Sequence, residues 1–299
     1  MDIFLTGAAG YIGGSVAARL LEAGHSVRGL VRTSEKAELL AKLGIEPVVG
    51  TLEDVGLLTQ EARRADGVVN TANADHLPSV HALLAALAGT EKPLLHTSGS
   101  SVIGDDARGN RVAQAIFDED TPFVVPPAKQ HRRDIDLMVL RAAGSGVRSA
   151  VICPSNIYGT GRGANPHSVQ IPFLADNARR QGFVQVIGQG VNRWSNVHID
   201  DLAELYLLAL AKAPAGAFYF AESGEASFGE IGGAIAARLG LGPVQSLPAE
   251  SAAEKWGESR AYYSFGSNSR VRARRARSEL GWTPRHTSVT SWILSEMPV

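Results

Sequence analysis

Three glycines near the N-terminus constrain the fold more than any other feature of the sequence. In "TGAAGYIGG" they are Gly7, Gly10 and Gly13, placed between an apolar run, residues 2–6, and an amphipathic segment, residues 11–23. In a strand-to-helix turn of this kind, Gly7 permits the tight turn, Gly10 admits a pyrophosphate and Gly13 allows close helix–sheet packing. The helix N-terminus then presents free N–H groups to phosphates. The pattern predicts a dinucleotide-binding turn.

Apolar runs and amphipathic segments alternate through the first half of the chain. Strands are expected at residues 26–32, 46–50, 66–72, 93–98 and 148–154, and helices at 35–44, 130–143, 200–213 and 228–240. Such alternation predicts an α/β fold of the Rossmann type, a doubly wound parallel sheet with right-handed crossovers. The pattern becomes less regular after about Gly159. We therefore expect a dinucleotide-binding domain at residues 1–165, to which 196–222 return, and a smaller C-terminal α/β substrate lobe at 166–195 and 223–299.

Composition limits the partners. The formal net charge is -1 and the charged fraction is 20%, which gives no electrostatic reason to expect nucleic acid or an anionic membrane. No apolar run reaches the length of a membrane span, and the N-terminus begins directly on an apolar strand without a basic leader. The single Cys153 cannot form an intramolecular disulfide, and the scattered histidines show no metal-ligand spacing. A cytoplasmic protein with a small-molecule substrate and no metal is expected.

The residues after the second expected strand indicate which nicotinamide cofactor is bound. An NAD enzyme usually has an acid there for the ribose 2′-hydroxyl, but this chain has Arg32, Thr33 and Ser34. An Arg forms charge-assisted hydrogen bonds with a 2′-phosphate. The pattern favours NADP(H) over NAD(H), with Arg32 as a solvated surface charge the alternative.

Several motifs together resemble the extended and atypical short-chain dehydrogenase/reductases, the superfamily of NAD-dependent epimerases and dehydratases. They are "TGAAGYIGG", "HTSGSSVIGD", "CPSNIYG", "NVHIDD" and "ELGWTP", and they span nearly the whole chain. The resemblance implies a substrate lobe beside the Rossmann domain. It also implies further cofactor-binding residues: Ala9, Tyr11 and Ile12 in the turn, Ser34, Thr51 and Leu52 near the adenosine, and Thr71, Ala72, Pro154, Asn156 and Ile157 along the strand ends. The family usually has Asp where Thr51 stands.

The chain departs from that family at its catalytic dyad. None of the six tyrosines is followed by Lys four residues later, so the usual Tyr-x-x-x-Lys is absent. One alignment places Val125 and Lys129 at the two positions, with prolines between them. The other, which we prefer, places Ala128 and Arg132 there, and Asp136 where the family often has an acid. Arg132 could then keep the contact to the nicotinamide ribose, but it cannot act as a base near neutral pH.

Replacement catalytic residues are sought along the same strand ends. Ser98 matches the substrate-facing Ser/Thr region of the family, with Thr97 second and a strand cap as the alternative role. Tyr158 is a further catalytic candidate, although packing as a wall is its more common role. Substrate contacts are expected from residues at the end of the fifth strand, after the sixth strand and in "NRWSNVH": Ser98, Ser100, Asn156, Arg193, Trp194 and His198. By the resemblance Arg193 would contact phosphates, while Trp194 would supply an aromatic wall.

Three functions remain open at this point. The first is an NADP-dependent oxidoreductase acting on a small carbonyl, alcohol or related compound with a non-standard proton donor. The second is a non-catalytic NADP sensor that regulates a partner, and the third is a sugar-nucleotide-type epimerase. The missing Tyr favours the second, and the retained "NRW" cleft residues favour the first. The chain is expected to be a monomer or a homodimer.

Overall fold

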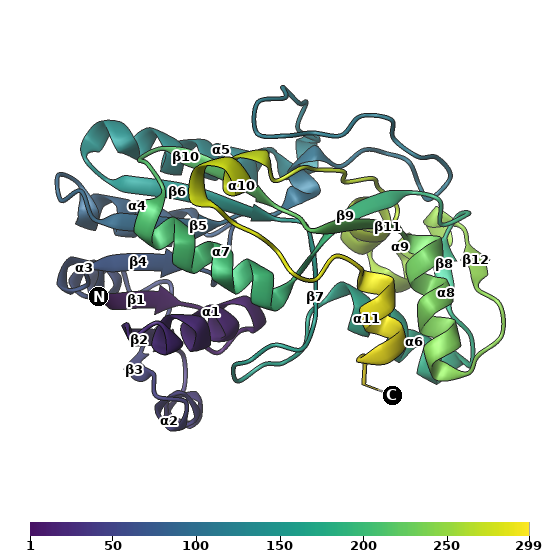
Figure 1. The fold of residues 1–299 in the computed structure, drawn as a ribbon, viewed down its shortest axis with the longest axis horizontal. Coiled ribbons are helices and arrows are strands. Elements are labelled where there is room, and N and C mark those ends of the chain that lie inside the picture. Colours follow the sequence, from purple (N-terminus) through teal and green to yellow (C-terminus); the bar gives the residue numbers. More distant parts are fainter. Residues whose placement is uncertain (299) are drawn as a thin grey trace.

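Seven parallel strands form the main sheet of the structure, a computed structural model that describes residues 1–298. Their order is β10-β6-β5-β4-β1-β2-β3, so the direction of strand addition reverses between β1 and β4 (Figure 1). The strands are β1 (Asp2–Thr6), β2 (Ser26–Val31), β3 (Glu46–Val49), β4 (Gly67–Asn70), β5 (Pro93–Thr97), β6 (Arg148–Pro154) and β10 (Ala217–Ala221). In such a sheet, ligands bind at the carboxyl ends of the strands beside the reversal. The predicted doubly wound α/β fold is confirmed.

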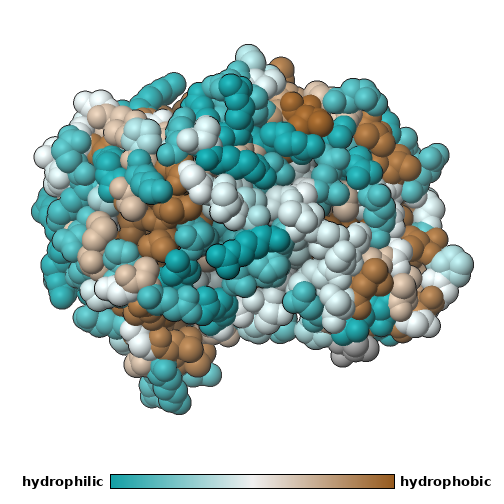
Figure 2. Space-filling model, viewed as in Figure 1, coloured by the Kyte–Doolittle hydropathy of each residue, from teal (hydrophilic) through white to brown (hydrophobic). Residues whose placement is uncertain are grey.

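Helices cover both faces of this sheet. They are α1 (Tyr11–Glu22), α2 (Ser34–Lys42), α3 (Val55–Arg64), α4 (Leu77–Leu87), α5 (Gln130–Arg141) and α7 (Ile199–Lys212). In Figure 1, α1 and α7 lie side by side in front of the sheet, whereas α3, α4 and α5 pack in succession. Hydrophilic side chains cover most of the face in Figure 2. Within residues 1–298, no helix is long and apolar enough to cross a membrane.

Smaller sheets and helices build the rest of the molecule. A three-stranded sheet contains β7 (Asn156–Tyr158), β9 (Arg193–His198) and β11 (Gly224–Ser227), and a two-stranded one contains β8 (Gln185–Ile187) and β12 (Gln245–Leu247). The helices are α6 (Gln170–Gln181), α8 (Phe228–Leu239), α9 (Ala249–Trp256), α10 (Arg274–Leu280) and α11 (Val289–Ser295), with a π-helical segment η4 (Ser259–Phe265) before α10. Ser227 and Glu230 start α8 with a reciprocal capping box.

The buried hydrophobic side chains form two separate cores. The first core joins the main sheet and its helices, and the second joins α6, α8, α9 and α11. Residues 271–282 were expected in the C-terminal lobe, yet Val271, Leu280 and Trp282 pack in the first core. Trp282 is held there because its indole N–H donates to the carbonyl of Asp201 at the start of α7. Local patterning cannot show such a return of the chain.

A buried ion pair ties α3 to the sheet. Arg28, on β2, is 1% exposed, and its guanidinium contacts the carboxylate of Glu61 and donates to the Glu61 carbonyl at 3.3 Å. The same guanidinium also pairs with Asp2 at 3.1 Å. Removing one partner of a buried pair leaves the other charge without compensation, which costs far more than the net worth of the pair.

We predict that Glu61→Leu lowers the free energy of unfolding by about 3–5 kcal/mol, because it strands the Arg28 guanidinium in the interior. Urea denaturation measures this change. The control Glu38→Leu, on the exposed side of α2, should change stability by less than about 0.5 kcal/mol. The double variant Arg28→Met/Glu61→Leu should recover much of the loss. Equal losses for Glu61→Leu and its control would contradict the role assigned to the pair.

Candidate functional site

The glycine turn after β1 has the geometry that its sequence predicts. Gly7 has φ +78°, and a Cβ there would lie 2.8 Å from the Cα of Ala72. A Cβ on Gly13 would lie 2.2 Å from the carbonyl oxygen of Gly7. Neither position accepts a side chain. Gly10 precedes α1 without any capping side chain, so the N–H groups of the first helical turn stay free to bind an anion.

A cavity of about 670 Å³ opens beside this turn, and we call it the glycine-loop cavity. Its walls come from the ends of β1 and β2, the residues after β3 and β4, and part of the loop that follows β7. The predicted cofactor residues among its lining are Gly7, Ala9, Gly10, Arg32, Thr51, Leu52 and Ala72. The cavity therefore joins a phosphate-binding turn to the β2 and β3 ends, where the adenosine half of a dinucleotide would fit.

The charged residues of this cavity are both basic. Arg32 and Lys36 line it and are exposed, and no carboxylate lies among its lining residues in the described part of the chain. Lys36 was not predicted from the sequence. The sequence did contain a signal for Lys36, because it follows Arg32 by four residues and lies within the first turn of the expected helix. Thr33 caps that helix by accepting from the N–H of Lys36 at 3.3 Å, which holds both cations at one end of β2.

A loop that follows β7 closes one side of the glycine-loop cavity. Its residues Ala164 and Asn165 line the cavity beside Asn73. The loop reaches this place because two glycines meet without side chains: a Cβ on Gly163 would lie 2.4 Å from the Cα of Gly14. These three lining residues were not predicted from the sequence, since no local signal shows where a loop folds back.

The other predicted cofactor residues lie outside this cavity. The Tyr11 hydroxyl donates to the carbonyl of Gly159 at 2.9 Å, and the Thr71 hydroxyl donates to the carbonyl of Thr6 at 2.8 Å. Both hydroxyls therefore serve the protein's own backbone. The remaining members are found in α1, at the exposed start of α2, or at and after the end of β6: Ile12, Gly13, Ser34, Pro154, Asn156 and Ile157.

A buried polar cluster lies at the carboxyl ends of β4 and β5. The Ser98 hydroxyl donates to Asp136 Oδ2 at 2.8 Å, and Asp136 on α5 is fully buried. The Asn70 amide donates to His96 Nδ1 at 3.0 Å, so the neutral imidazole carries its proton on Nε2. Nε2 lies 3.9 Å from Asp136 Oδ1, and neither atom has a hydrogen-bond partner within residues 1–298. We call Ser98, Asp136 and His96 the serine–aspartate cluster.

Burial sets the protonation states in this cluster. It raises the pKa of Asp136 to about 7, against the hydrogen bond from Ser98 and the charges of Arg133 and Arg132, which lower it. Burial also lowers the pKa of His96 to about 4. At neutral pH the histidine is therefore uncharged, while the aspartate gains and loses its proton.

Arg132, the residue of the preferred alignment of the missing dyad, adjoins the cluster. A Cβ built on Gly99 would lie 3.3 Å from Arg132 Nη1, so the guanidinium covers the residue that follows Ser98. Arg132 also makes a two-pronged contact with the carboxylate of Asp75, which holds the pKa of Asp75 below its usual range. Lys129, the residue of the other alignment, lies over the ring of Tyr263 at 5.4 Å.

Other predicted catalytic hydroxyls are bound elsewhere. Thr97 forms a 2.6 Å hydrogen bond with the hydroxyl of buried Tyr206, on the α7 side of β5. The Tyr158 hydroxyl donates to the carbonyl of His286 at 3.1 Å, and its ring packs against Trp292. Successive strand residues point to opposite faces, which explains why Thr97 and Ser98 have different surroundings. These contacts of Tyr158 are of the packing kind that was expected as its more common role.

The predicted substrate contacts are likewise engaged within the protein. Arg193 pairs with Glu225 at 2.8 Å and with Glu230 at 3.3 Å, which neutralises the cation expected to meet phosphates. The Trp194 indole is buried and donates to the carbonyl of Ser267. The remaining members are buried and hydrogen-bonded: Ser100 to Ser269, Asn156 to Asn196, and His198 to the N–H of Asp200.

Three potential metal ligands meet where the C-terminal segment reaches α7, although no metal was expected. Candidate ligand atoms of His198, Asp200 and His286 lie within 4.8 Å of one another. The two imidazole rings are stacked, with centroids 3.8 Å apart and planes 21° from parallel. A metal ion lies in the plane of each imidazole that binds it, so the lone pairs of two stacked rings do not converge on one ion. The group does not fit a metal as it stands.

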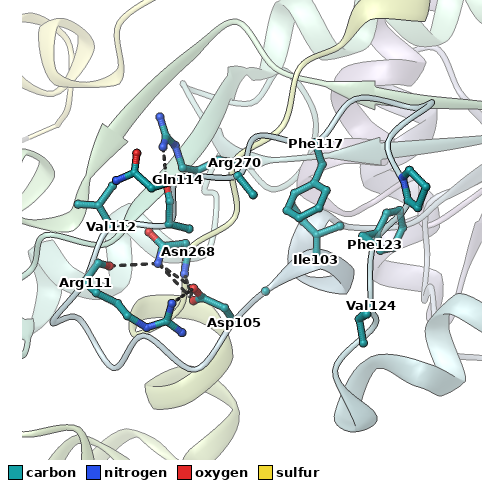
Figure 3. A pocket seen from close by; sticks show the side chains of 14 residues that line it. Ile103, Asp105, Arg111, Val112, Gln114, Phe117, Phe123, Val124, Asn268 and Arg270 are labelled. Atoms are coloured by element: carbon teal, nitrogen blue, oxygen red, sulfur yellow. Dashed lines mark hydrogen bonds and ion pairs between the residues drawn. The ribbon is translucent and has the colours of Figure 1, made fainter.

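A second cavity, of about 710 Å³, lies between the long segment after β5 and the segment before α10 (Figure 3). We call it the outer cavity. Asp105 accepts from the backbone and side chain of Asn268 and pairs with Arg111. Ile103 and Phe123 supply part of an apolar wall. Because these polar groups already have partners, the apolar wall is the part left for a ligand, and sequence patterning had given no signal for it.

The comparisons with known proteins agree with this geometry. Residues 3–219 match the NAD dependent epimerase/dehydratase family. The chain belongs to this family. A family member of this kind is an enzyme that depends on a nicotinamide dinucleotide, as the glycine turn and its cavity indicate.

This family member is similar to several named proteins. It is 35% identical to Oxidase ucsJ of Acremonium sp., over 94% of this chain and 92% of that protein. It is 30% identical to 4-hydroxy-2-methyl-3-oxo-4-farnesyl-3,4-dihydroquinoline-1-oxide ketoreductase of Stigmatella aurantiaca, over 75% and 69%. Its fold is similar to a dTDP-glucose 4,6-dehydratase of Streptomyces venezuelae with NAD bound, with TM-score 0.78 and 21% identity over 99% and 95% of the chains.

The raised pKa of Asp136 predicts a pH-dependent stability, which Asp136→Asn should remove. The unfolded chain ionises this group near pH 4 and the folded protein near pH 7, so wild-type stability is lost as pH rises between them. We expect the stability of the Asn variant, relative to wild type, to grow by about 4 kcal/mol across this range. The lowered pKa of His96 makes stability rise with pH below pH 6.5, but His96 is present in both proteins and contributes equally to each. Urea denaturation at several pH values measures the difference, and a pH-independent difference would contradict the assignment.

Proposed function

We propose that this protein is an NADPH-dependent reductase that acts on the carbonyl group of a small molecule. The observation that carries the cofactor assignment is the pair Arg32 and Lys36 in the glycine-loop cavity, without a carboxylate among the described lining residues. Two cations there suit the 2′-phosphate of NADPH, whereas the 2′-hydroxyl of NADH is usually bound by an acid. NADPH, when bound, supplies the hydride that reduces the carbonyl carbon.

The polar residues beyond the cofactor turn support a carbonyl substrate without a diphosphate. A nucleotide sugar requires cations for its phosphates, but Arg193 is already neutralised by Glu225 and Glu230. The outer cavity offers an apolar wall instead, from Ile103, Phe117 and Phe123. The similarity to a ketoreductase at 30% identity is consistent with this substrate class. We therefore favour reduction over the sensor and epimerase alternatives.

Different residues of the chain would bind the cofactor and the substrate. The glycine turn and the first turn of α1 would hold the pyrophosphate, and Arg32 with Lys36 the 2′-phosphate. Arg132, which covers Gly99, would lie near the nicotinamide ribose, and Ser98 would contact the carbonyl oxygen of the substrate. A monomer or homodimer in the cytoplasm stays a prediction.

We predict that Arg32→Ala weakens NADPH binding by about ten- to a hundred-fold, because it removes charge-assisted hydrogen bonds to the 2′-phosphate. Affinity for NADH should change little. Calorimetric titration with NADPH, NADP+ and NADH measures both. Lys42→Ala removes the same charge from the far end of α2, outside the cavity, and should leave NADPH binding unchanged.

Equal affinity of the wild type for NADPH and NADH would overturn the cofactor assignment. Once NADPH binding is established, NADPH consumption with a panel of small ketones and aldehydes tests the activity. Tight NADPH binding without turnover of any member would favour the sensor alternative.

A further inference from the structure

The missing Tyr leaves the proposed reductase without its usual proton donor, and the serine–aspartate cluster offers a different one. Ser98 stands at the end of β5 and keeps a small exposed fraction, 7%, while Asp136 beneath it has none. The 2.8 Å hydrogen bond between them joins the hydroxyl of this slightly exposed residue to a carboxyl group in the interior.

We propose that Asp136 is the internal proton source of the site, an inference that rests on the proposed function. Asp136 positions the Ser98 hydroxyl, and it restores the proton of Ser98 after Ser98 has protonated the carbonyl oxygen of the substrate. Asp136 is then a positioning residue that acts through Ser98, the group that touches the substrate.

The direction of one hydrogen bond decides whether Ser98 can donate. When Asp136 is ionised, the only hydroxyl proton of Ser98 points to Asp136 Oδ2. When Asp136 is protonated, its O–H donates to Ser98 Oγ, and the Ser98 proton is free to turn toward a ligand. Ser98 can therefore donate a hydrogen bond to a ligand only when Asp136 is protonated.

The proton transfers balance the reduction. As the carbonyl carbon gains a hydride, the C=O π pair moves to oxygen and forms a bond to the proton of Ser98. Ser98 Oγ then takes the proton of Asp136 Oδ2, which leaves Asp136 as a carboxylate. After the alcohol leaves, water at the exposed edge of Ser98 returns a proton through Oγ to Asp136. The ketone is reduced, the cofactor is oxidised, and one proton is taken from solvent.

The groups that face Asp136 keep its proton exchangeable near neutral pH. His96 on β5 and Cys153 on β6 are buried beside it and carry no charge at neutral pH, since burial lowers the pKa of the first and raises that of the second. On α5, Arg132 and Arg133 favour the carboxylate, and Asp75 from the loop after β4 favours the acid. Burial outweighs both arginines and brings the pKa of Asp136 to about 7.

The other candidate donors at these strand ends are already committed. Thr97 bonds to Tyr206, Tyr158 donates to the carbonyl of His286, and Ser100 bonds to Ser269. Arg132 holds its proton too tightly to donate near neutral pH. Ser98 alone among these hydroxyls is joined to an acid that exchanges its proton near pH 7.

Two measurements test this proposal with the full-length protein. The first is ¹³C NMR of the carboxyl carbon of Asp136, with NADPH present and absent, assigned by its disappearance in Asp136→Asn. We expect it to titrate near pH 7. The second is reduction of ethyl acetoacetate, a small keto ester used as probe, by wild type, Ser98→Ala, Asp136→Asn and Asp136→Glu. The control is Asp134→Asn, an exposed carboxylate on the same helix that bonds to Gln130.

We expect Asp136→Asn and Ser98→Ala to lower kcat by about 10²–10⁴-fold with unchanged NADPH affinity, and Asp134→Asn to behave as wild type. Wild-type kcat/KM should fall above about pH 7, because the reduction needs the protonated acid. Asp136→Asn should lose this pH dependence and Asp136→Glu should restore part of the rate. Unchanged NADPH titrations would show that the variants are folded.

An Asp136 carboxyl group whose carbon signal shows it ionised throughout about pH 5 to 9 would overturn the proposal. An Asp136→Asn variant with the same kcat and the same pH profile as wild type would also overturn it. In these cases the reductase activity itself would stand. A wild type that binds NADPH but reduces neither ethyl acetoacetate nor any other carbonyl would instead overturn the proposed function, and the proton source with it.

Discussion

One segment, residues 265–273, leads from the end of η4 to the start of α10 and holds the two halves of the molecule together through buried hydrogen bonds. The Asn192 amide donates to the carbonyls of Phe265 and Ser267 at 2.9 and 2.6 Å. Further along the same segment, the Ser269 hydroxyl donates to the carbonyl of Ser100 at 2.9 Å. The segment therefore reaches from β9 to the end of β5. Buried polar groups need hydrogen-bond partners, and these bonds supply them. The position of the lobe against the sheet follows from this seam.

The seam also decides which polar groups remain for chemistry. Its hydrogen bonds occupy Ser100, and the ion pairs beside it occupy Arg193 and Glu225. At the far end of the same C-terminal region, the Asp201 carboxylate accepts from the backbone N–H groups of Arg285 and His286, which fixes that strand of chain on α7. Side chains that looked functional by type are therefore engaged in contacts within the protein. The serine–aspartate cluster lies outside these bonds, with Asp136 fully buried and its hydroxyl partner Ser98 slightly exposed.

Much of the cofactor site could be predicted because its signals are local. The turn from Gly7 to Gly13 joins one strand to the next helix, so its spacing in sequence equals its arrangement in space, and Arg32 follows the neighbouring strand. The serine–aspartate cluster could be predicted only in part. Ser98 was identified from the end of β5, and Asp136 was noticed only as an aligned acid. Their contact joins residues 38 positions apart, and no periodicity within β5 or α5 indicates which face of each will meet.

The sequence by itself determined the alternation of strands and helices, the parallel sheet and the glycine turn, because these depend on local patterning and on the handedness of crossovers. Tertiary structure decided the rest. It returned residues 271–282 to the first core and brought Asn165 over the glycine-loop cavity. It also buried Asp136 beneath Ser98 and committed Thr97 to Tyr206. The physical reason is the same in each case: burial and hydrogen bonding depend on what packs against a side chain, and those neighbours come from distant parts of the chain.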